Sequence, residues 1–186
     1  MSMEASLPLS EPARVIVVMG VSSSGKTVVG EAIARRLHAP FLDGDDYHPE
    51  ANIKKMSAGI PLTDEDRWPW LESLGKALHE KAGPKDVAVG ACSALKRIYR
   101  DFITRAAGEP VVFVYLEGTY GTIDARIKAR QHHFMPASLL QSQFATLEPP
   151  QPDENFVAVD IADTPERMAD KALKHLPYLH SFRRGQ

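Results

Sequence analysis

Residues 20–27, GVSSSGKT, match the phosphate-binding pattern G-x-x-x-x-G-K-[ST] at every specified position. In this pattern, consecutive backbone N–H groups surround the phosphates, the lysine reaches the β- and γ-phosphates, and the last hydroxyl can ligate Mg²⁺. An ordinary Gly/Ser turn is the alternative, but a strand pattern precedes the octapeptide and a helical pattern follows it, as the motif requires. We therefore predict a nucleotide site formed by Gly20, Ser22, Ser23, Ser24, Gly25, Lys26 and Thr27.

Two carboxylates, Asp43 and Asp45, follow a short predicted strand at residues 39–42. Phosphoryl transfer needs charge neutralisation around the γ-phosphate and a group that orients or deprotonates the nucleophile. The strand expected at residues 87–92 leads into Ser93, so it offers no acid for this purpose. We expect Asp43 to face Mg²⁺ together with Thr27, and Asp45 to face an acceptor hydroxyl. Solvated acids in an Asp-Gly turn are the alternative.

Two groups of basic residues suit an anionic site. Arg126 and Arg130 stand four residues apart in a predicted helix, which suits a mobile lid in which one stacks on adenine and the other neutralises transferring charge. Arg67, Lys96 and Arg100 could give a substrate pocket a positive wall, which implies an acidic acceptor such as a carboxylate. Solvated helix surfaces are the alternative for both groups.

The histidines and the single cysteine indicate a functional role less clearly than the basic and acidic residues do. His48 could donate to a substrate hydroxyl or merely cap a turn. His132 and His133 are not spaced like a pair of zinc ligands on a helix, and no carboxylate or cysteine accompanies them as a further ligand. We therefore expect lid contacts rather than a metal site. Cys92 is the single cysteine, which excludes a disulfide framework and a cysteine-rich zinc site and favours a reducing compartment.

Strand and helix patterns alternate along the chain. Helices are expected at residues 50–58, in a segment whose first turn starts near Asp66, at 95–105, at 122–129, at 135–147 and after the Thr164-Pro165 cap. This order predicts an α/β protein with a mostly parallel five-stranded sheet and helices on both faces. Ligands of such sheets bind at the carboxyl ends of the strands, where the candidate residues should converge. The strands are expected at residues 15–19, 39–42, 87–92, 111–116 and 156–160.

Length and charge narrow the class of protein. The 186 residues are 44% hydrophobic and 25% charged, which suits one domain over residues 14–186 after a flexible tail at 1–13. A net charge of −2 gives no basic field for nucleic-acid binding. The sequence shows neither a secretory signal nor an apolar run of membrane-spanning length, so we expect no membrane association and a cytoplasmic location.

Together these motifs resemble the gluconate kinase family, small P-loop enzymes grouped with shikimate and adenylylsulfate kinases. The resemblance spans roughly residues 14–176. It is carried by Met19-Gly20-Val21-Ser22, Phe41-Leu42-Asp43-Gly44-Asp45, His48-Pro49, Asn52-Ile53, Lys55-Met56, Gly59, Pro61-Leu62, Asp66-Arg67, Pro69-Trp70-Leu71, Cys92-Ser93-Ala94-Leu95-Lys96, Tyr99-Arg100-Asp101 and Gln143-Phe144.

The resemblance implies a three-layer P-loop kinase fold with a small helical lid at about residues 126–148. It implies transfer of the γ-phosphoryl group of ATP to the 6-hydroxyl of D-gluconate, with Mg²⁺, in a homodimer. The catalytic residues would be Lys26, Asp45 and Arg130, and Arg126 would join the P-loop in binding the nucleotide. Thr27 and Asp43 would hold the metal. The candidate substrate contacts are Asp45, His48, Arg67, Lys96 and Arg100.

One position departs from the family pattern. The family commonly has Gly between the two serines of the loop, where this chain has Ser23. If that position needs a positive φ, Ser23 strains the loop by about 1–2 kcal/mol, which would perturb nucleotide affinity without abolishing it.

Three alternatives differ from gluconate phosphorylation. A kinase for another small acidic metabolite, such as shikimate, shares the P-loop, the Asp-x-Asp pair and the lid arginines, although His48-Pro49 and residues 92–96 favour gluconate. A nucleotide-dependent switch would carry D-x-x-G and N-K-x-D motifs, and neither occurs. A catalytically inactive binding module is disfavoured by the intact Lys26, Thr27, Asp43 and Asp45.

Overall fold

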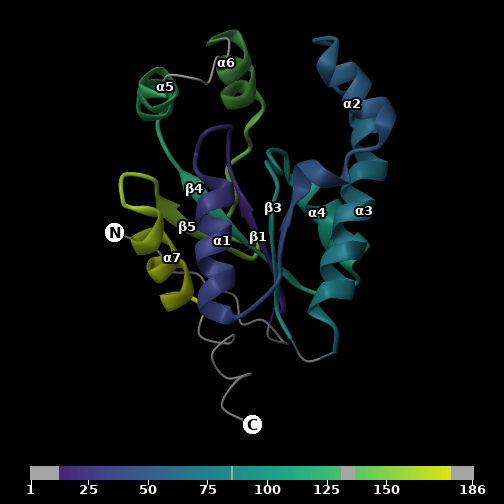
Figure 1. Ribbon diagram of the computed structural model, residues 1–186, viewed down its shortest axis with the longest axis vertical. Coiled ribbons are helices and arrows are strands. Elements are labelled where there is room, and N and C mark those ends of the chain that lie inside the picture. Colours follow the sequence, from purple (N-terminus) through teal and green to yellow (C-terminus); the bar gives the residue numbers. More distant parts are fainter. Residues whose placement is uncertain (1–12, 85, 131–136, 177–186) are drawn as a thin grey trace.

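The computed structural model of the chain describes residues 13–84, 86–130 and 137–176 (Figure 1). Its strands form one sheet in the order β2-β3-β1-β4-β5, and every neighbouring pair is parallel. This confirms the predicted α/β class and all five predicted strands. Their bounds are β1 (Val15–Met19), β2 (Phe41–Asp43), β3 (Ala88–Ala91), β4 (Val111–Glu117) and β5 (Phe156–Asp160).

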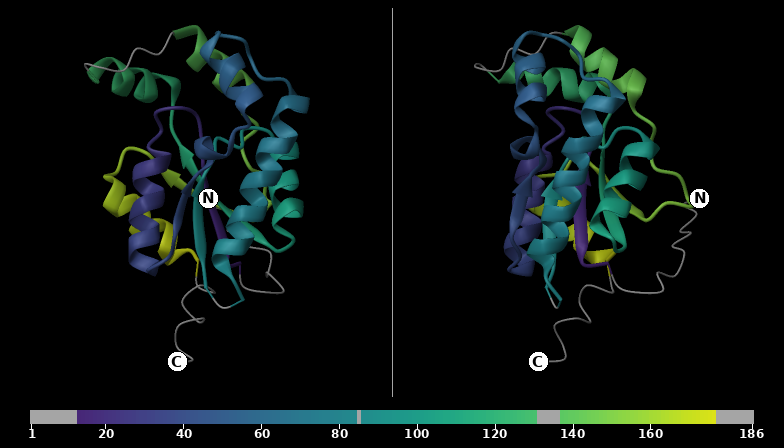
Figure 2. Two further views of the ribbon diagram at one scale, coloured as in Figure 1. Left: turned by 45° about the vertical axis from the view of Figure 1, so that its right-hand side comes forward. Right: turned by 90° about the vertical axis from the view of Figure 1, so that its right-hand side faces the viewer.

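Helices cover both faces of the sheet, which gives three layers (Figure 1). On one face lie α1 (Lys26–Leu37) and α7 (Pro165–Lys174), and on the other lie α3 (Asp64–Ala82) and α4 (Arg97–Ala107). Above the carboxyl ends of the strands lie α2 (Glu50–Ser57), α5 (Tyr120–Ala129) and α6 (Ala137–Thr146), as both views of Figure 2 show. The short 3₁₀ helix η1 (Gly44–Tyr47) follows β2.

The central strand β1 is buried along its whole length because both of its faces are covered. Ile16 and Val18 pack in the apolar cluster that includes side chains of α1 and α7. Val15 and Val17 belong to the opposite cluster, with side chains of α3 and α4. A strand that is apolar on both faces forms the continuous hydrophobic run that the sequence shows at residues 15–19.

Helix α3 begins two residues before the predicted first turn near Asp66. Thr63 Oγ1 accepts the Asp66 N–H at 3.2 Å, and Asp66 Oδ2 accepts the Thr63 N–H at 2.9 Å, so a reciprocal capping box starts the helix at Asp64. Pro69 consequently lies inside the helix and leaves the Glu65 carbonyl without its helical donor. Both residues are exposed, which leaves that carbonyl open to solvation.

The structure can be compared with the predicted cap of the last helix and with the predicted N-terminal tail. Thr164 caps α7, with its hydroxyl accepting the Arg167 N–H at 3.3 Å, as predicted. Residues 1–12 of the predicted tail lie outside the described residues, whereas Ala13 is buried in the core.

Cys92 is buried and free. Across the described part of the chain, we find no helix with the length and apolar character of a membrane span.

Candidate active site

The loop after β1 closes onto the end of β3. The Gly20 N–H donates to the Ser93 carbonyl at 3.3 Å, and a Cβ at Gly20 would lie 2.9 Å from Ser24 Oγ, so glycine is required for this approach. Helix α1 begins at Lys26 with no side-chain cap and no acid in its first turn. Ser24 Oγ is buried without a hydrogen-bond partner among the described residues. Uncapped N–H groups and a buried hydroxyl form the cradle that a phosphate fits.

Lys26 lies inside this cradle. Its Nζ donates to the Val21 carbonyl at 3.0 Å. Desolvation lowers the pKa of Lys26, and its electrostatic interactions with Cys92, Asp45 and Asp43 act in the opposite direction. The ammonium group therefore lies within electrostatic range of both predicted carboxylates, as a site for a polyphosphate requires.

The carboxylates at the end of β2 differ in their surroundings. Asp43 Oδ1 accepts the Asp45 N–H at 3.0 Å, while its Oδ2 accepts the Thr27 hydroxyl at 3.5 Å. Asp45 is exposed, and its carboxylate makes no hydrogen bond to another described residue. A Cβ at Gly44 would lie 2.4 Å from the Ala91 carbonyl, so this glycine lets the two acids pack against the end of β3. Asp43 is thus fixed beside Thr27, and Asp45 is left available.

His48 is oriented by neighbours that the sequence analysis did not assign to the site. Its ring stacks on Trp70 with centroids 3.9 Å apart, and its Nδ1 accepts from Asn52 Nδ2 at 3.2 Å. Because an amide NH₂ only donates, the proton of the neutral imidazole is on Nε2. Desolvation lowers the pKa of His48, whereas Asp45 raises it and Arg67 lowers it. Asp45 and Arg67 therefore both lie within electrostatic range of His48.

Arg67 and Lys96 meet over one aromatic ring. The guanidinium carbon of Arg67 lies 5.3 Å from the Tyr99 ring centroid, and Lys96 Nζ lies 5.5 Å from it. Asp64 stands between the two cations, with its Oδ1 3.7 Å from Arg67 and 3.6 Å from Lys96. This oxygen also accepts the Tyr99 hydroxyl at 2.5 Å. Two cations and one carboxylate give this cluster a net positive charge.

The ionisation of Asp64 and Tyr99 follows from this contact. The hydrogen bond from Tyr99 is the main cause that holds the pKa of Asp64 below its ordinary value. Desolvation, followed by the bond to Asp64, raises the pKa of Tyr99 to about 12. Asp64 is consequently charged and Tyr99 neutral at physiological pH. Neither Asp64 nor Tyr99 is predicted as a site residue, because no local pattern indicates a contact between two side chains that are 35 residues apart in the sequence.

Arg100, predicted as a substrate contact, instead has a structural role. Its side chain is 1% exposed, its Nε and NH2 bind the two oxygens of Glu154 at 2.7 and 3.2 Å, and its NH1 donates to the Ala94 and Leu95 carbonyls. It therefore holds the segment that precedes Lys96, and its buried guanidinium is already engaged on all three nitrogens.

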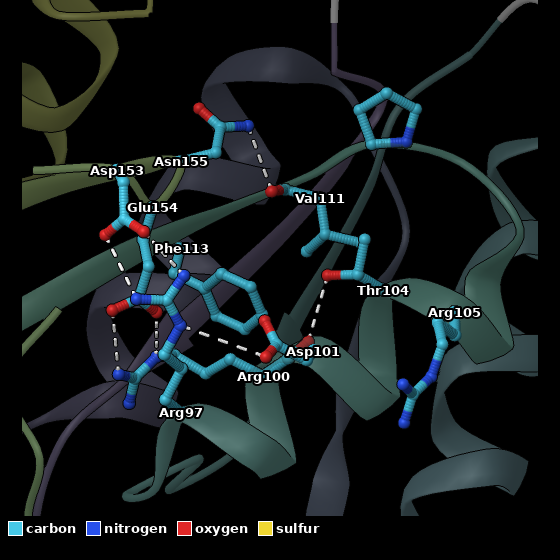
Figure 3. Close-up of a pocket in the computed structure, with 11 residues that line it drawn as sticks. Arg97, Arg100, Asp101, Thr104, Arg105, Val111, Phe113, Asp153, Glu154 and Asn155 are labelled. Carbon is cyan, nitrogen blue, oxygen red and sulfur yellow. Dashed lines mark hydrogen bonds and ion pairs between the residues drawn. The ribbon is translucent and has the colours of Figure 1, made fainter. Parts of the chain in front are cut away.

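A hollow of about 560 Å³ lies beside this ion pair, on the flank of α4 (Figure 3). Arg97 binds Asp153 there at 2.7 Å, next to the pair of Arg100 and Glu154. No residue of the loop at 20–27 or of the segment at 43–48 lines this hollow. It is separate from the candidate active site.

The two predicted lid arginines have different positions. Arg126 lies on α5 and donates to the Ile161 carbonyl, just after β5. Arg130 follows the last residue of α5 and is exposed, and its side chain makes no hydrogen bond or ion pair to the P-loop among the described residues. Because the helix ends at Ala129, Arg126 lies on the helix and Arg130 lies just beyond it. The two arginines therefore do not share one helix face as expected. His132 and His133 lie outside the described residues.

Ser23 adopts a left-handed backbone conformation, with a φ of 63°. This is the loop position at which the sequence departs from the family pattern. Ser23 therefore has the positive φ at which we expect strain in the loop. A side chain in this region costs about 1–2 kcal/mol relative to an unstrained backbone.

Comparison with known proteins gives a consistent set of relatives. The family model described as shikimate kinase matches residues 22–176. The thermosensitive gluconokinase of Escherichia coli (strain K12) is 51% identical over 146 residues, which cover 78% of this chain and 78% of the relative. The thermoresistant gluconokinase of the same organism is 45% identical over 151 residues, 81% of this chain and 86% of the relative. A solved gluconokinase structure from Sinorhizobium meliloti 1021 has a TM-score of 0.81 at 45% identity, covering 95% of this chain and 99% of that chain.

Replacing Ser23 by glycine should stabilise the fold. We expect Ser23→Gly to raise the free energy of unfolding by about 0.5–1 kcal/mol, because relief of strain exceeds the entropy that glycine adds to the unfolded chain. Ser23→Ala keeps the Cβ and should give no such gain. Urea denaturation of both variants measures the difference, and a Ser23→Gly midpoint no higher than that of Ser23→Ala contradicts the expectation.

Proposed function

We infer the reaction of this chain from its family, because the chain belongs to the shikimate kinase family and, within it, to the gluconokinases. We propose that it transfers the γ-phosphoryl group of ATP to the 6-hydroxyl of D-gluconate, giving 6-phospho-D-gluconate and ADP. The observation that supports an acidic acceptor is the cluster of Arg67 and Lys96 over the ring of Tyr99. Two cations there suit the carboxylate of a sugar acid.

The phosphates of ATP fit the loop at residues 20–27. The N-terminus of α1 offers N–H groups and a positive dipole end, and the buried Ser24 hydroxyl gains a partner there. Lys26 would turn from the Val21 carbonyl to the β- and γ-phosphates. We propose that Arg126, beside the Ile161 carbonyl, contacts the adenine and that Arg130 neutralises the transferring charge.

Thr27 and Asp43 would hold Mg²⁺. Their oxygen atoms lie 3.5 Å apart and are the hard ligands that Mg²⁺ prefers, with water and phosphate oxygens completing the coordination. In the described ranges, no cluster of three or more histidine, cysteine or acidic residues that could hold a metal occurs. When bound, Mg²⁺ supplies charge neutralisation on the β- and γ-phosphates.

Asp45 and His48 would act on the acceptor. Asp45 is exposed beside the phosphate cradle and is free to accept the proton of the 6-hydroxyl as its oxygen attacks the γ-phosphorus and the bond to ADP breaks. The Nε2–H of His48 can donate to another hydroxyl of the sugar acid. Arg67 and Lys96 would bind the carboxylate, braced by Asp64.

We propose in addition that the enzyme is a homodimer in the cytoplasm, without nucleic-acid or membrane partners. The resemblance to gluconate kinases supports the homodimer. The single buried cysteine suits a reducing compartment, and a net charge of −2 gives nucleic acid no basic field to bind.

A panel of acceptors tests the proposed reaction. With ATP and Mg²⁺, the purified enzyme should release ADP with D-gluconate and much more slowly with shikimate, adenylylsulfate or neutral glucose, since the neutral sugar lacks the carboxylate. A coupled ADP-release assay measures each rate. Turnover of another acid without turnover of gluconate would overturn the assignment.

Removing the charge of Asp45 should slow the chemical step. We expect Asp45→Asn to lower kcat by about 100-fold or more with ATP affinity retained, because the amide does not accept the proton of the acceptor hydroxyl. Asp46→Asn is the matched control, since Asp46 is the adjacent exposed acid. Steady-state kinetics of both variants are the measurement, and equal kcat values would remove Asp45 from this role.

Removing the charge of Lys96 should weaken acceptor binding. Loss of a charge-assisted hydrogen bond predicts a rise of about 10- to 100-fold in the KM for gluconate in Lys96→Met, with the KM for ATP nearly unchanged. Lys76→Met, at an exposed lysine of α3 that pairs with Glu72, serves as the control. A rise confined to the KM for ATP would argue against Lys96 as a carboxylate contact.

A further inference from the structure

A glutamine of α6 binds the P-loop through both ends of its amide. The Ser22 N–H donates to Gln143 Oε1 at 2.6 Å, and Gln143 Nε2 donates to Ser22 Oγ at 2.7 Å. The two residues are 121 positions apart in the sequence. A primary amide combines an acceptor and a donor in one planar group, so it matches a backbone N–H and a hydroxyl of the same residue.

This contact fixes the orientation of Ser22. Its N–H is occupied by the glutamine, and its hydroxyl oxygen accepts from the glutamine, which leaves the hydroxyl proton free to donate elsewhere. Ser22 directly precedes Ser23, the residue with a positive φ of 63°. Gln143 therefore braces the loop from outside at the residue before its strained position.

Helix α6 is itself fixed on the acceptor side of the site. Just after α6, the Glu148 N–H donates to the Leu95 carbonyl at 2.8 Å, and the Glu148 carboxylate accepts the Arg97 N–H at 2.9 Å. These bonds flank Lys96, a candidate contact for the acceptor. One helix thus connects the phosphate loop to the segment that carries Lys96, a candidate acceptor contact.

The same helix also packs on α5. The rings of Tyr120 and Phe144 have their centroids 5.6 Å apart. Helix α5 carries Arg126, which contacts the Ile161 carbonyl. Figure 2 shows α5 and α6 together above the edge of the sheet that carries the P-loop. The two hydrogen bonds between Gln143 and Ser22 link this helix pair to the loop.

We propose that Gln143 is a positioning residue for the nucleotide. It holds the Ser22 peptide and hydroxyl in the orientation in which the loop receives the phosphates, and it links the seating of the phosphates to the helix pair α5–α6. The proposal rests on the P-loop's role in nucleotide binding and is independent of the identity of the acceptor.

Calorimetric titration with ADP, in the presence of Mg²⁺, tests this role without any acceptor. Gln143→Ala loses both hydrogen bonds, so its Kd for ADP and its KM for ATP should rise by about 5- to 30-fold, with the KM for gluconate changed less than twofold. Gln141→Ala is the matched control, because Gln141 is an exposed glutamine on the same helix. It should bind ADP like the unaltered protein.

Two further variants separate positioning from general support of the fold. Gln143→Met fills a similar volume without the amide, so it should show the same loss of ADP affinity with a melting temperature close to that of the unaltered protein. The Ser22→Ala variant already lacks one of the two hydrogen bonds. In this background, Gln143→Ala should raise the Kd for ADP by at most half of the factor by which it raises that Kd in the otherwise unaltered protein. Coupling of this kind is the signature of a direct contact.

Several outcomes would overturn the proposal: ADP binding unchanged in Gln143→Met, an equal loss in Gln141→Ala, or the full loss retained in the Ser22→Ala background. Absence of gluconate turnover in the unaltered enzyme, together with weakened ADP binding in Gln143→Met, would refute the proposed acceptor and support the positioning role.

Discussion

Parallel pairing of β1 with β3 brings the ends of two buried strands to one level, and the active-site residues depend on this alignment. The Gly20 N–H reaches the Ser93 carbonyl at 3.3 Å, which ties the loop after β1 to the segment after β3. Slippage of this register by one residue would turn the apolar side chains of each face to the other side. The phosphate region and the acceptor region are therefore set by the same hydrogen-bonded ladder.

Carboxylates keep the cations of both regions in place. Lys26 lies within the field of Asp43 and Asp45, while Arg67 and Lys96 lie on either side of Asp64. The cluster of Arg67, Lys96 and Asp64 is thus ordered before any anion arrives, which limits the reorganisation needed at the moment of reaction. Substitution of Asp64 by a neutral residue would leave two like charges facing one ring, without the carboxylate that lies between them.

Support for these clusters comes from residues outside the site. Arg100 and Glu154 form a buried pair that also holds the Ala94 and Leu95 carbonyls, just before Lys96. A buried guanidinium is tolerated only with its donors satisfied, and this requirement fixes the surrounding segment. The basic residues of the stretch at 96–100 thus divide between one candidate substrate contact, Lys96, and two ion pairs, that of Arg97 with Asp153 and that of Arg100 with Glu154.

The sequence by itself determined the five strands, the phosphate loop and the acids after β2, because apolar runs, glycine positions and short motifs are local signals. It indicated strain at Ser23, and the positive φ agrees. Only the tertiary structure decided that Arg100 binds Glu154, that Asp64 binds Tyr99 and that Gln143 binds Ser22. Those partners stand 54, 35 and 121 residues apart, and helical periodicity specifies the face of a side chain but not the group that lies opposite.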